Sequence, residues 1–285
     1  MTRVAGGLWV RARRVLRAVA VFLFTAAVLL VILFPLLWQV RSSFMTRAEV
    51  YGSYSLMPSL PTVSNYVAVW QGFRFARSFL NTLLVTASVM IGTVISCSMA
   101  GFAFAHIRFP GRAALFYLYL GTMMVPFAVT LVPSYYFVAR MLGWVNKLPS
   151  VFAPFFLGNA MGTFLMRQYY ATQPRELIEA SFIDGASWWT IWRAVMVSLS
   201  TATLLTLGVI TLRDQWNNFL WPVIIIQSDE VKTLSVALKD FALNRQASFA
   251  TIAAGVVMAT LPMVVLLTIG NKAFLKGVQL QGVSR

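Results

Sequence analysis

Long apolar runs constrain this chain more than any other feature of its sequence. A segment needs about 20 predominantly apolar residues to cross the hydrocarbon core of a membrane as a helix. Six runs meet or approach that length, at residues 18–40, 78–105, 113–138, 149–167, 195–226 and 249–271. The sequence therefore predicts an all-α integral membrane protein with six transmembrane helices.

The composition supports a membrane protein and argues against a nucleic-acid-binding one. Hydrophobic residues make up 59% of the chain and charged residues 11%, whereas a soluble domain carries about 25% charged residues. The net charge of +15 arises from 23 basic residues scattered between the apolar runs. Such scattering is typical of residues that set membrane topology. We therefore expect lipid, and no nucleic acid, around this chain.

The N-terminal segment predicts the orientation in the membrane. Five arginines within residues 1–17 precede the first apolar run, which is longer than the 7 to 15 residues or so of a secretory signal. We interpret the run as a retained span. Six spans place both termini on one side, and that side carries 13 basic residues against 9 on the other. We therefore expect the protein in the cytoplasmic or inner membrane of the cell. Both the segment 1–17 and the tail 272–285 are expected on its cytoplasmic side.

Helix breakers in the third and fourth apolar runs predict irregular geometry there. Pro126 and Pro133 in the third run predict a kink or local unwinding. The fourth run is interrupted by Pro154, Gly158, Asn159 and Gly162. The second run instead has small residues at every fourth position, Ser88, Gly92, Ser96 and Ala100. Such a row lets another helix backbone approach closely, and packing within the chain is the simpler expectation.

A polar island at residues 173–187 separates the fourth and fifth runs. Pro174 suits the first turn of a helix, and Gly185 is placed to end one in a left-handed conformation. The pattern predicts a helix of at most about three turns. Its apolar residues fall on one stripe, Leu177, Ala180 and Ile183, with Glu176, Glu179 and Asp184 outside it. A helix this short is marginal alone in water, so something else must hold it.

The island carries a family resemblance. Glu179-Ala180-Ser181 followed by Asp184-Gly185-Ala186 resembles the EAA loop of ABC-importer permease subunits, in the carbohydrate-uptake branch that includes the maltose-transporter and glycerol-3-phosphate-transporter permeases. Six further short motifs resemble the same branch and occur in the same order: Asn81-Thr82-Leu83, Phe102-Ala103-Phe104-Ala105, Phe109-Pro110-Gly111-Arg112, Met123-Met124-Val125-Pro126, Leu142-Gly143-Trp144 and Pro174-Arg175-Glu176-Leu177. Together these pieces cover about residues 75–222.

The resemblance implies the type I permease fold of ABC importers over residues 18–271. It implies that the loop 173–187 is a cytoplasmic coupling helix that docks on an ATPase subunit, through Glu176, Glu179, Ala180, Asp184, Gly185 and Ala186. It also implies the partners: a second permease subunit, two ATPase subunits that hold ATP and Mg, and an extracytoplasmic solute-binding protein that delivers a sugar or polyol. The competing interpretation of the loop is an ordinary solvated turn with a capped helix.

The sequence departs from the family pattern in two places. Family members usually have a proline about fourteen residues after the aspartate of the motif and often another four later, where this chain has Ser198 and Ala202. We therefore expect a straighter start to the fifth span. The usual Gly-Ala-Val-Lys-Gly tail is also absent, because the chain ends in Leu280-Gln281-Gly282-Val283-Ser284-Arg285.

The fifth run contains a polar cluster made of Arg213, Asp214, Trp216, Asn217 and Asn218. Charged groups at mid-bilayer are costly, so they usually face a bundle interior or an aqueous cavity. Sugars are bound by amide and carboxylate hydrogen bonds together with an aromatic face. These residues are therefore candidates for lining a translocation pathway. The alternative is that the span ends near Leu212 and the cluster lies at the outer interface, with Trp216 in an aromatic belt.

No enzymatic chemistry can be assembled from this sequence. There is no Gly-rich phosphate loop ending in Gly-Lys-Ser or Gly-Lys-Thr, so ATP hydrolysis must come from another chain. His106 is the single histidine and Cys97 the single cysteine, which leaves a metal site nothing to build on. An ion-coupled secondary carrier is the alternative function. It would require intramembrane carboxylates and repeated halves, and only Asp214 fits.

Overall fold

The computed structural model describes residues 2–52, 55, 57–72, 74–243 and 247–282. Within those residues the ordered elements are all helices. The chain divides into a smaller unit, Met1–Val69 with Arg245–Met258, and a larger unit, Trp70–Asn244 with Ala259–Arg285.

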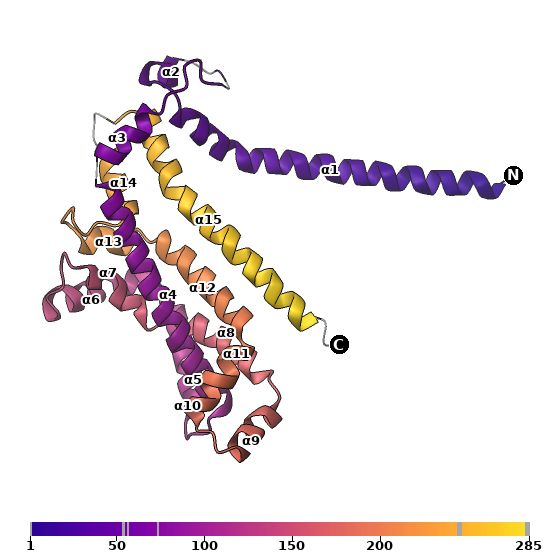
Figure 1. The fold of residues 1–285 in the computed structure, drawn as a ribbon, viewed down its shortest axis with the longest axis vertical. Coiled ribbons are helices and arrows are strands. Elements are labelled where there is room, and N and C mark those ends of the chain that lie inside the picture. Colours follow the sequence, from indigo (N-terminus) through magenta and orange to yellow (C-terminus); the bar gives the residue numbers. More distant parts are fainter. Residues whose placement is uncertain (1, 53–54, 56, 73, 244–246, 283–285) are drawn as a thin grey trace. The chain divides into compact units, whose positions relative to one another are not determined.

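The smaller unit contains α1 (Thr2–Ser43), α2 (Arg47–Gly52) and the start of α3 (Ser64–Gly72) and of α15 (Phe249–Gly282) (Figure 1). The buried side chain of Asn65 organises it. Its Nδ2 donates to the carbonyl oxygens of Ser43 at 3.0 Å and Met45 at 2.8 Å, and its Oδ1 accepts from the Thr251 hydroxyl at 3.3 Å.

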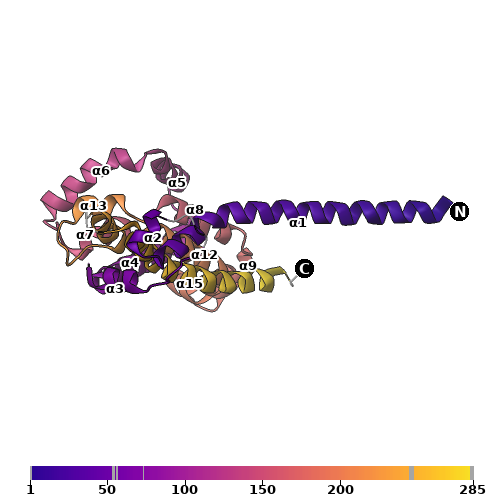
Figure 2. The same ribbon diagram turned by 90° about the horizontal axis from the view of Figure 1, so that it is seen from above.

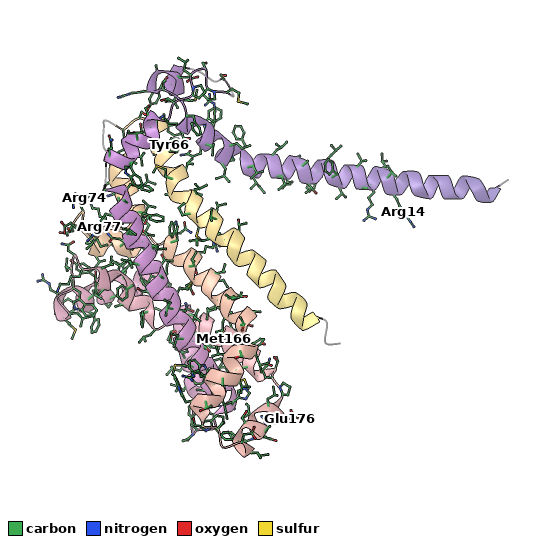
Figure 3. All side chains as sticks on the ribbon, viewed as in Figure 1. Arg14, Tyr66, Arg74, Arg77, Met166 and Glu176 are labelled. Atoms are coloured by element: carbon green, nitrogen blue, oxygen red, sulfur yellow. The ribbon has the colours of Figure 1, made fainter. Side chains whose placement is uncertain are left out.

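The larger unit is built around α4 (Phe75–His106), which runs unbroken for 32 residues. Helices α7 (Leu148–Phe156), α8 (Ala160–Ala171) and α12 (Thr201–Trp216) pack along it (Figures 1 and 2). Buried residues from α4, α8 and the segment before α12 form one hydrophobic core, in which Met166 is completely enclosed (Figure 3).

The packing of α4 depends on the predicted small residues. A Cβ atom added at Gly92 would stand 2.3 Å from the carbonyl oxygen of Phe156, and one at Gly101 would stand 2.6 Å from Cβ of Met166. Neither position has room for any side chain. The close approach expected from the small-residue row is therefore confirmed at Gly92, and it lies within the chain.

The third and fourth apolar runs are bent spans, as their prolines and glycines predicted. Helix α5 (Arg112–Gly121) with the 3₁₀ turn η1 (Thr122–Met124) meets α6 (Phe127–Tyr136) and the π-helical η2 (Phe137–Met141) at 97°. This bend falls at Pro126, which stands before α6 in an extended conformation. Helices α7 and α8 meet at 40°, across the break that contains Gly158 and Asn159.

The fifth run differs from its prediction. After α9 (Arg175–Ile183) the chain forms α10 (Trp188–Thr190), η3 (Ile191–Met196) and α11 (Val197–Leu199), and then bends by 81° into α12. The expectation of a straight start, based on the missing prolines, was therefore wrong. The bend lies at Ser200, a buried residue whose hydroxyl donates back to the carbonyl oxygen of Met196 at 2.7 Å.

The predicted limits of that span, 195–226, were also wrong. Helix α12 ends at Trp216, and a separate short helix, α13 (Leu220–Ile225), follows before α14 (Leu234–Ala242). The indole N–H of Trp221 anchors α13 by donating to the carbonyl oxygen of Ser150 at 2.9 Å.

Within the described residues, six candidate spans result when each bent pair counts as one. Three are continuous, Arg14–Ser43, Phe75–His106 and Phe249–Thr268, and the three bent pairs supply the others. The most apolar window of the first has no buried residue, which is the pattern of a helix that faces lipid. The all-α membrane fold predicted from the apolar runs is thus confirmed.

Candidate functional site

The polar island forms a capped helix at one end of the larger unit. Pro174 precedes α9 as its N-terminal flanking residue, one position earlier than the first-turn place expected for it. At the other end Gly185 adopts φ = 77°, the left-handed conformation predicted for it. The amides of Asp184, Gly185 and Ala186 bind the last carbonyl groups of the helix at 2.9 to 3.0 Å. The segment therefore has a defined shape despite its length.

One apolar side chain fastens α9 to the rest of the unit. Ile178 is 6% exposed and belongs to the main core. The ring of Phe182 on α9 also meets the ring of Trp188 on α10 edge to face, with centroids 4.7 Å apart. These contacts provide the tertiary support that so short a helix requires.

The predicted docking residues lie on the outer side of α9. Glu176, Glu179, Ala180, Asp184 and Gly185 are exposed, and Ala186 is partly buried. Glu176 projects from the end of the larger unit opposite Arg74 and Arg77 (Figure 3).

The predicted apolar stripe is exposed as well. Leu177 is 39% and Ile183 is 87% exposed. The sequence pattern identified this stripe but did not identify Ile178 as the residue that the chain itself buries.

A small basic pocket lies beside Glu179. It has a volume of about 150 Å³ and is bordered by Ala105, His106, Arg108, Arg112, Arg175, Ile178, Glu179 and Trp188. The guanidinium of Arg112 donates to the carbonyl oxygens of Ala105 and Ile107, which ties α5 to the end of α4. Three arginines around one glutamate leave this surface with a net positive charge.

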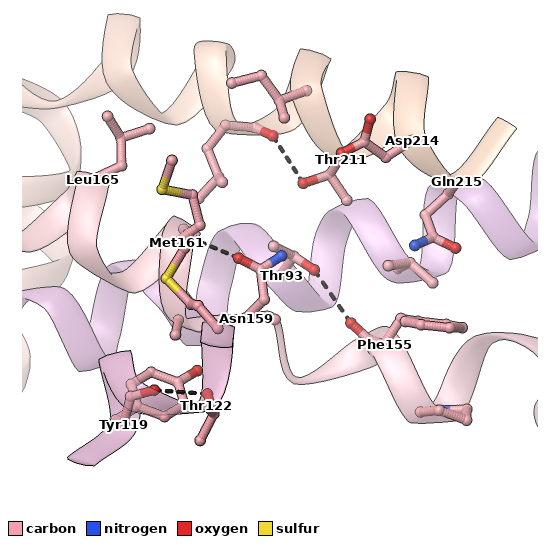
Figure 4. Close-up of a pocket in the computed structure, with 18 of the residues that line it drawn as sticks. Thr93, Tyr119, Thr122, Phe155, Asn159, Met161, Leu165, Thr211, Asp214 and Gln215 are labelled. Carbon is pink, nitrogen blue, oxygen red and sulfur yellow. Dashed lines mark hydrogen bonds between the residues drawn. The ribbon is translucent and has the colours of Figure 1, made fainter. Parts of the chain in front are cut away.

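A larger cavity lies in the middle of the unit (Figure 4). It measures about 560 Å³ and lies among α4, α7, α8, α12 and the bend between α5 and α6. Its polar lining consists of Thr93, Tyr119, Thr122, Thr130, Asn159, Thr211, Asp214 and Gln215.

Most of the polar groups around this cavity are already bonded within the protein. Thr93 donates to the carbonyl oxygen of Phe155 at 3.4 Å, and Thr211 donates to that of Leu207 at 2.8 Å. Asn159 accepts the amide N–H of Gly162 at 2.8 Å and so begins α8. Asp214 and Gln215, at the end of α12, are the cavity groups with the greatest remaining capacity to bind a solute.

The structure separates the five polar residues proposed for the pathway. Arg213, Asp214 and Asn217 are all exposed, and Asp214 also borders the cavity. Trp216 is 6% exposed, meets Phe79 edge to face, and donates its indole N–H to the carbonyl oxygen of Ala259 at 3.3 Å. Asn218 donates to Oε1 of Gln215 at 3.4 Å.

Sequence reasoning missed most of the cavity. Thr211 precedes Asp214 by three residues on α12, a spacing that puts both on one helix face. That spacing could have identified Thr211 and Gln215. Nothing local in the sequence places Thr93 or Tyr119 beside them, because they come from other helices. Among the described residues, no group of three or more His, Cys, Asp or Glu side chains is arranged to hold a metal ion.

Residues 92–278 match the sequence profile of the family described as binding-protein-dependent transport system inner membrane component. The chain belongs to this family. It is the membrane-spanning permease component of an ATP-driven importer, and separate subunits hydrolyse the ATP.

Individual relatives extend over nearly the whole chain. It is 28% identical over 261 residues to the probable ABC transporter permease protein YurM of Bacillus subtilis, covering 91% of this chain and 86% of that protein. It is 27% identical to the arabinooligosaccharides transport system permease protein AraQ of Halalkalibacterium halodurans, over 90% of this chain and 93% of that protein. It is 29% identical to the sn-glycerol-3-phosphate transport system permease protein UgpE of Escherichia coli, over 87% and 90%.

A solved structure confirms the fold. A chain of a bacterial ABC transporter that imports the acidic polysaccharide alginate superposes with a TM-score of 0.80 at 23% identity, covering 93% of this chain and 97% of that one. The type I permease fold implied by the sequence resemblance is thus correct. None of these relatives supports the alternative of an ion-coupled secondary carrier.

Proposed function

We propose that this permease imports a carbohydrate or related polyol and is driven by ATPase subunits that dock on α9. The observation that carries the docking proposal is the division of the apolar residues of α9. The chain buries Ile178 but leaves Leu177 and Ile183 exposed beside Glu179. An exposed apolar stripe flanked by charge is the pattern of a helix that a partner covers.

The proposed assembly contains this chain, a second permease subunit, two ATPase subunits with ATP and Mg, and an extracytoplasmic solute-binding protein. The segment 173–187, residues 1–17 and the tail 272–285 then all lie in the cytoplasm, in agreement with the excess of basic residues on that side. Closure of the ATPase subunits would move α9 and open the membrane pathway alternately to each side.

The carbohydrate proposal is supported by the relatives and by the chemistry of the cavity. AraQ is described as transporting arabinooligosaccharides, UgpE as transporting sn-glycerol 3-phosphate, and the structural neighbour as importing alginate. The cavity combines carboxylate, amide and hydroxyl groups with the ring of Tyr119. These are the groups that bind polyhydroxylated solutes. We propose that Asp214 contacts the solute, while Arg213, Asn217 and Asn218 lie near the opening of the pathway and Trp216 supports α12.

The docking proposal is tested by charge reversal at each end of the larger unit. Glu179→Arg is expected to lose the ATPase subunits from the purified complex, because it adds a fourth positive charge to the surface around α9. Glu230→Arg is the matched control, since Glu230 is also exposed but lies at the opposite end of α4. Co-purification of the ATPase subunits measures both. Retention of the ATPase by the Glu179→Arg complex would contradict the proposal.

The solute class is tested by uptake into vesicles that contain the whole transporter and its binding protein. The probes are arabinooligosaccharide, glycerol 3-phosphate and, as a control, a sugar that proton-coupled carriers transport. We expect uptake of one of the first two only with ATP inside, and weaker uptake in Asp214→Asn. Uptake that continued without ATP and stopped with the proton gradient would favour a secondary carrier.

A further inference from the structure

The 81° bend between α11 and α12 is held without proline. No proline occurs between Pro174 and Pro222, although proline is the usual cause of a sharp bend. Three hydroxyl-bearing residues meet at the bend instead. Ser98 is 1% exposed, and Tyr170 and Ser200 are both 0% exposed.

These hydroxyl groups form a continuous chain of hydrogen bonds. The indole N–H of Trp192 donates to Oγ of Ser98 at 3.0 Å. Oγ of Ser98 lies 2.7 Å from the Tyr170 hydroxyl, which lies 3.1 Å from Oγ of Ser200. The Ser200 hydroxyl in turn donates to the carbonyl oxygen of Met196 at 2.7 Å.

The two ends of this chain fix its direction. An indole nitrogen can only donate and a carbonyl oxygen can only accept. Ser98 must therefore donate to Tyr170, and Tyr170 must donate to Ser200. Each hydroxyl then donates once and accepts once, so every member is satisfied in a buried setting where an unpaired group would be costly.

The chain of bonds joins three parts of the larger unit. Ser98 belongs to α4, and Tyr170 lies at the end of α8, three residues before the segment 173–187 begins. Trp192 lies in η3 and Ser200 lies between α11 and α12, in the part of the chain that leaves this segment. Next to them, the Tyr169 hydroxyl donates to the carbonyl oxygen of Leu199 at 2.6 Å. The end of α8, which leads into the segment 173–187, and the η3 helix, which follows it, are thus both hydrogen-bonded to residues at the bend.

We propose that Ser98, Tyr170, Trp192 and Ser200, here called the bend latch, are positioning residues that transmit movement of α9 to α12. Helix α12 begins at the bend and carries Thr211 and Asp214 to the cavity. When the hydrogen bonds of the bend latch are formed, α12 and the segment 173–187 move together as a rigid body. Without it, the bend can flex and absorb the movement. This inference rests on the proposed docking of ATPase subunits at α9.

Tyr170→Phe is a suitable test because it removes one hydroxyl and keeps the ring, and the only donor that loses its partner is the Ser98 hydroxyl inside the same chain of bonds. Ser98 still accepts from Trp192, and Ser200 still donates to Met196. The ring can keep its edge-to-face contact with Phe102, whose centroid is 6.0 Å away. Ser200→Ala cuts the same bond from the other side, so the double variant should be no worse than either single variant.

The experiment uses the complete transporter in lipid vesicles, with spin labels at exposed positions Ile91 on α4 and Leu205 on α12. Trapping the ATPase with ATP and vanadate is expected to change the distance between the labels. In Tyr170→Phe and Ser200→Ala we expect ATP hydrolysis and ATPase association to persist. The fraction of molecules that undergo the distance change should fall about three- to tenfold, as expected for one interhelical hydrogen bond.

Two matched substitutions control for the chemical change alone. Tyr117→Phe removes a hydroxyl from an exposed side chain of α5, and Ser198→Ala removes one that donates to the carbonyl oxygen of Ala194 in its own helical segment. Both should behave as the unmodified protein.

The outcomes separate this inference from the docking proposal. An unchanged distance response in Tyr170→Phe would overturn the latch, and so would loss of the ATPase subunits from that variant, because the hydroxyl would then serve docking itself. Retention of the ATPase in Glu179→Arg would instead overturn the docking proposal.

Discussion

The two ends of the larger unit are held in different ways. At the end near Arg74 and Arg77, the loop before α14 is clamped to α4. Nδ2 of Asn81 donates to the carbonyl oxygens of Glu230 at 2.9 Å and Lys232 at 3.1 Å, and Thr82 accepts the amide N–H of Leu234 at 2.7 Å. At the other end, α9 depends on one buried side chain, Ile178, and on an aromatic contact.

This difference indicates how a permease can be rigid and movable at once. Backbone groups of the clamped loop are satisfied by buried side chains of α4, so that end cannot shift without losing several bonds. Helix α9 keeps its own hydrogen bonds whatever its position, and its exposed stripe is available to a partner. Substitutions at the two ends can break or sharpen this comparison.

The largest effect is expected at Ile178. Ile178→Ala removes the buried anchor of α9 and should lower the free energy of unfolding by about 2 to 4 kcal/mol. Ile183→Ala makes the same chemical change on the same helix, where the side chain is 87% exposed, and should change stability by less than about 0.5 kcal/mol. Thermal unfolding in detergent measures both. Equal effects would mean that α9 is not anchored by Ile178.

A smaller effect is expected at the clamped end. Asn81 is 4% exposed, and Asn81→Ala removes the donor to the carbonyl oxygens of Glu230 and Lys232, of which that of Glu230 keeps a second donor in Nε of Arg77. The loss should cost about 1 to 3 kcal/mol. Asn217→Ala is the control, because Asn217 is exposed and donates only to the carbonyl oxygen of Arg213 in its own helix. Chemical unfolding of the two variants compares them. The clamp is refuted if Asn81→Ala is no less stable than Asn217→Ala.

The ion pairs beside the clamp predict a weak pH dependence. Burial raises the pKa of Asp240, but hydrogen bonds from Lys232 and Lys239 outweigh burial and hold that pKa below the ordinary value of 3.8 for an aspartate. Since the folded-state pKa is the lower one, the pair stabilises the protein above about pH 4 and this contribution disappears as the pH falls through the folded-state value.

The contribution of this pair should be below about 1 kcal/mol, because the Asp240 side chain is 35% exposed and solvent screens it. Asp240→Asn should therefore flatten the dependence of the unfolding midpoint on pH below about 4. A midpoint that falls as steeply in Asp240→Asn as in the unmodified protein would assign the acid sensitivity to other groups.

The smallest effect is expected for Arg74. Its guanidinium lies 3.6 Å from the carboxylate of Glu230, and the two side chains are 65% and 70% exposed. Arg74→Ala should change the free energy of unfolding by less than about 0.5 kcal/mol, because exposed ion pairs contribute little. Denaturant titration measures it. A loss above 1 kcal/mol would show that surface charge, rather than Asn81, holds the clamp.

The sequence by itself determined the class of protein, the number of candidate spans, the two bends at Pro126 and near Gly158, and the left-handed turn at Gly185. These follow from local chemistry: apolar length, ring closure in proline and the missing side chain of glycine act at the residue where they occur. The EAA-like loop was also recognisable, since its residues are contiguous.

Only the tertiary structure decided the bend at Ser200, the burial of Ile178 and the make-up of the cavity. Each depends on groups that meet from distant parts of the chain. The helix bends at Ser200, where the hydroxyl groups of Tyr170 and Ser98 complete a chain of hydrogen bonds. Because no proline stands there, the local sequence gives no sign of the bend. Contacts between helices, which the sequence of α9 alone cannot specify, decide which apolar residue of α9 is buried and which stays exposed for a partner.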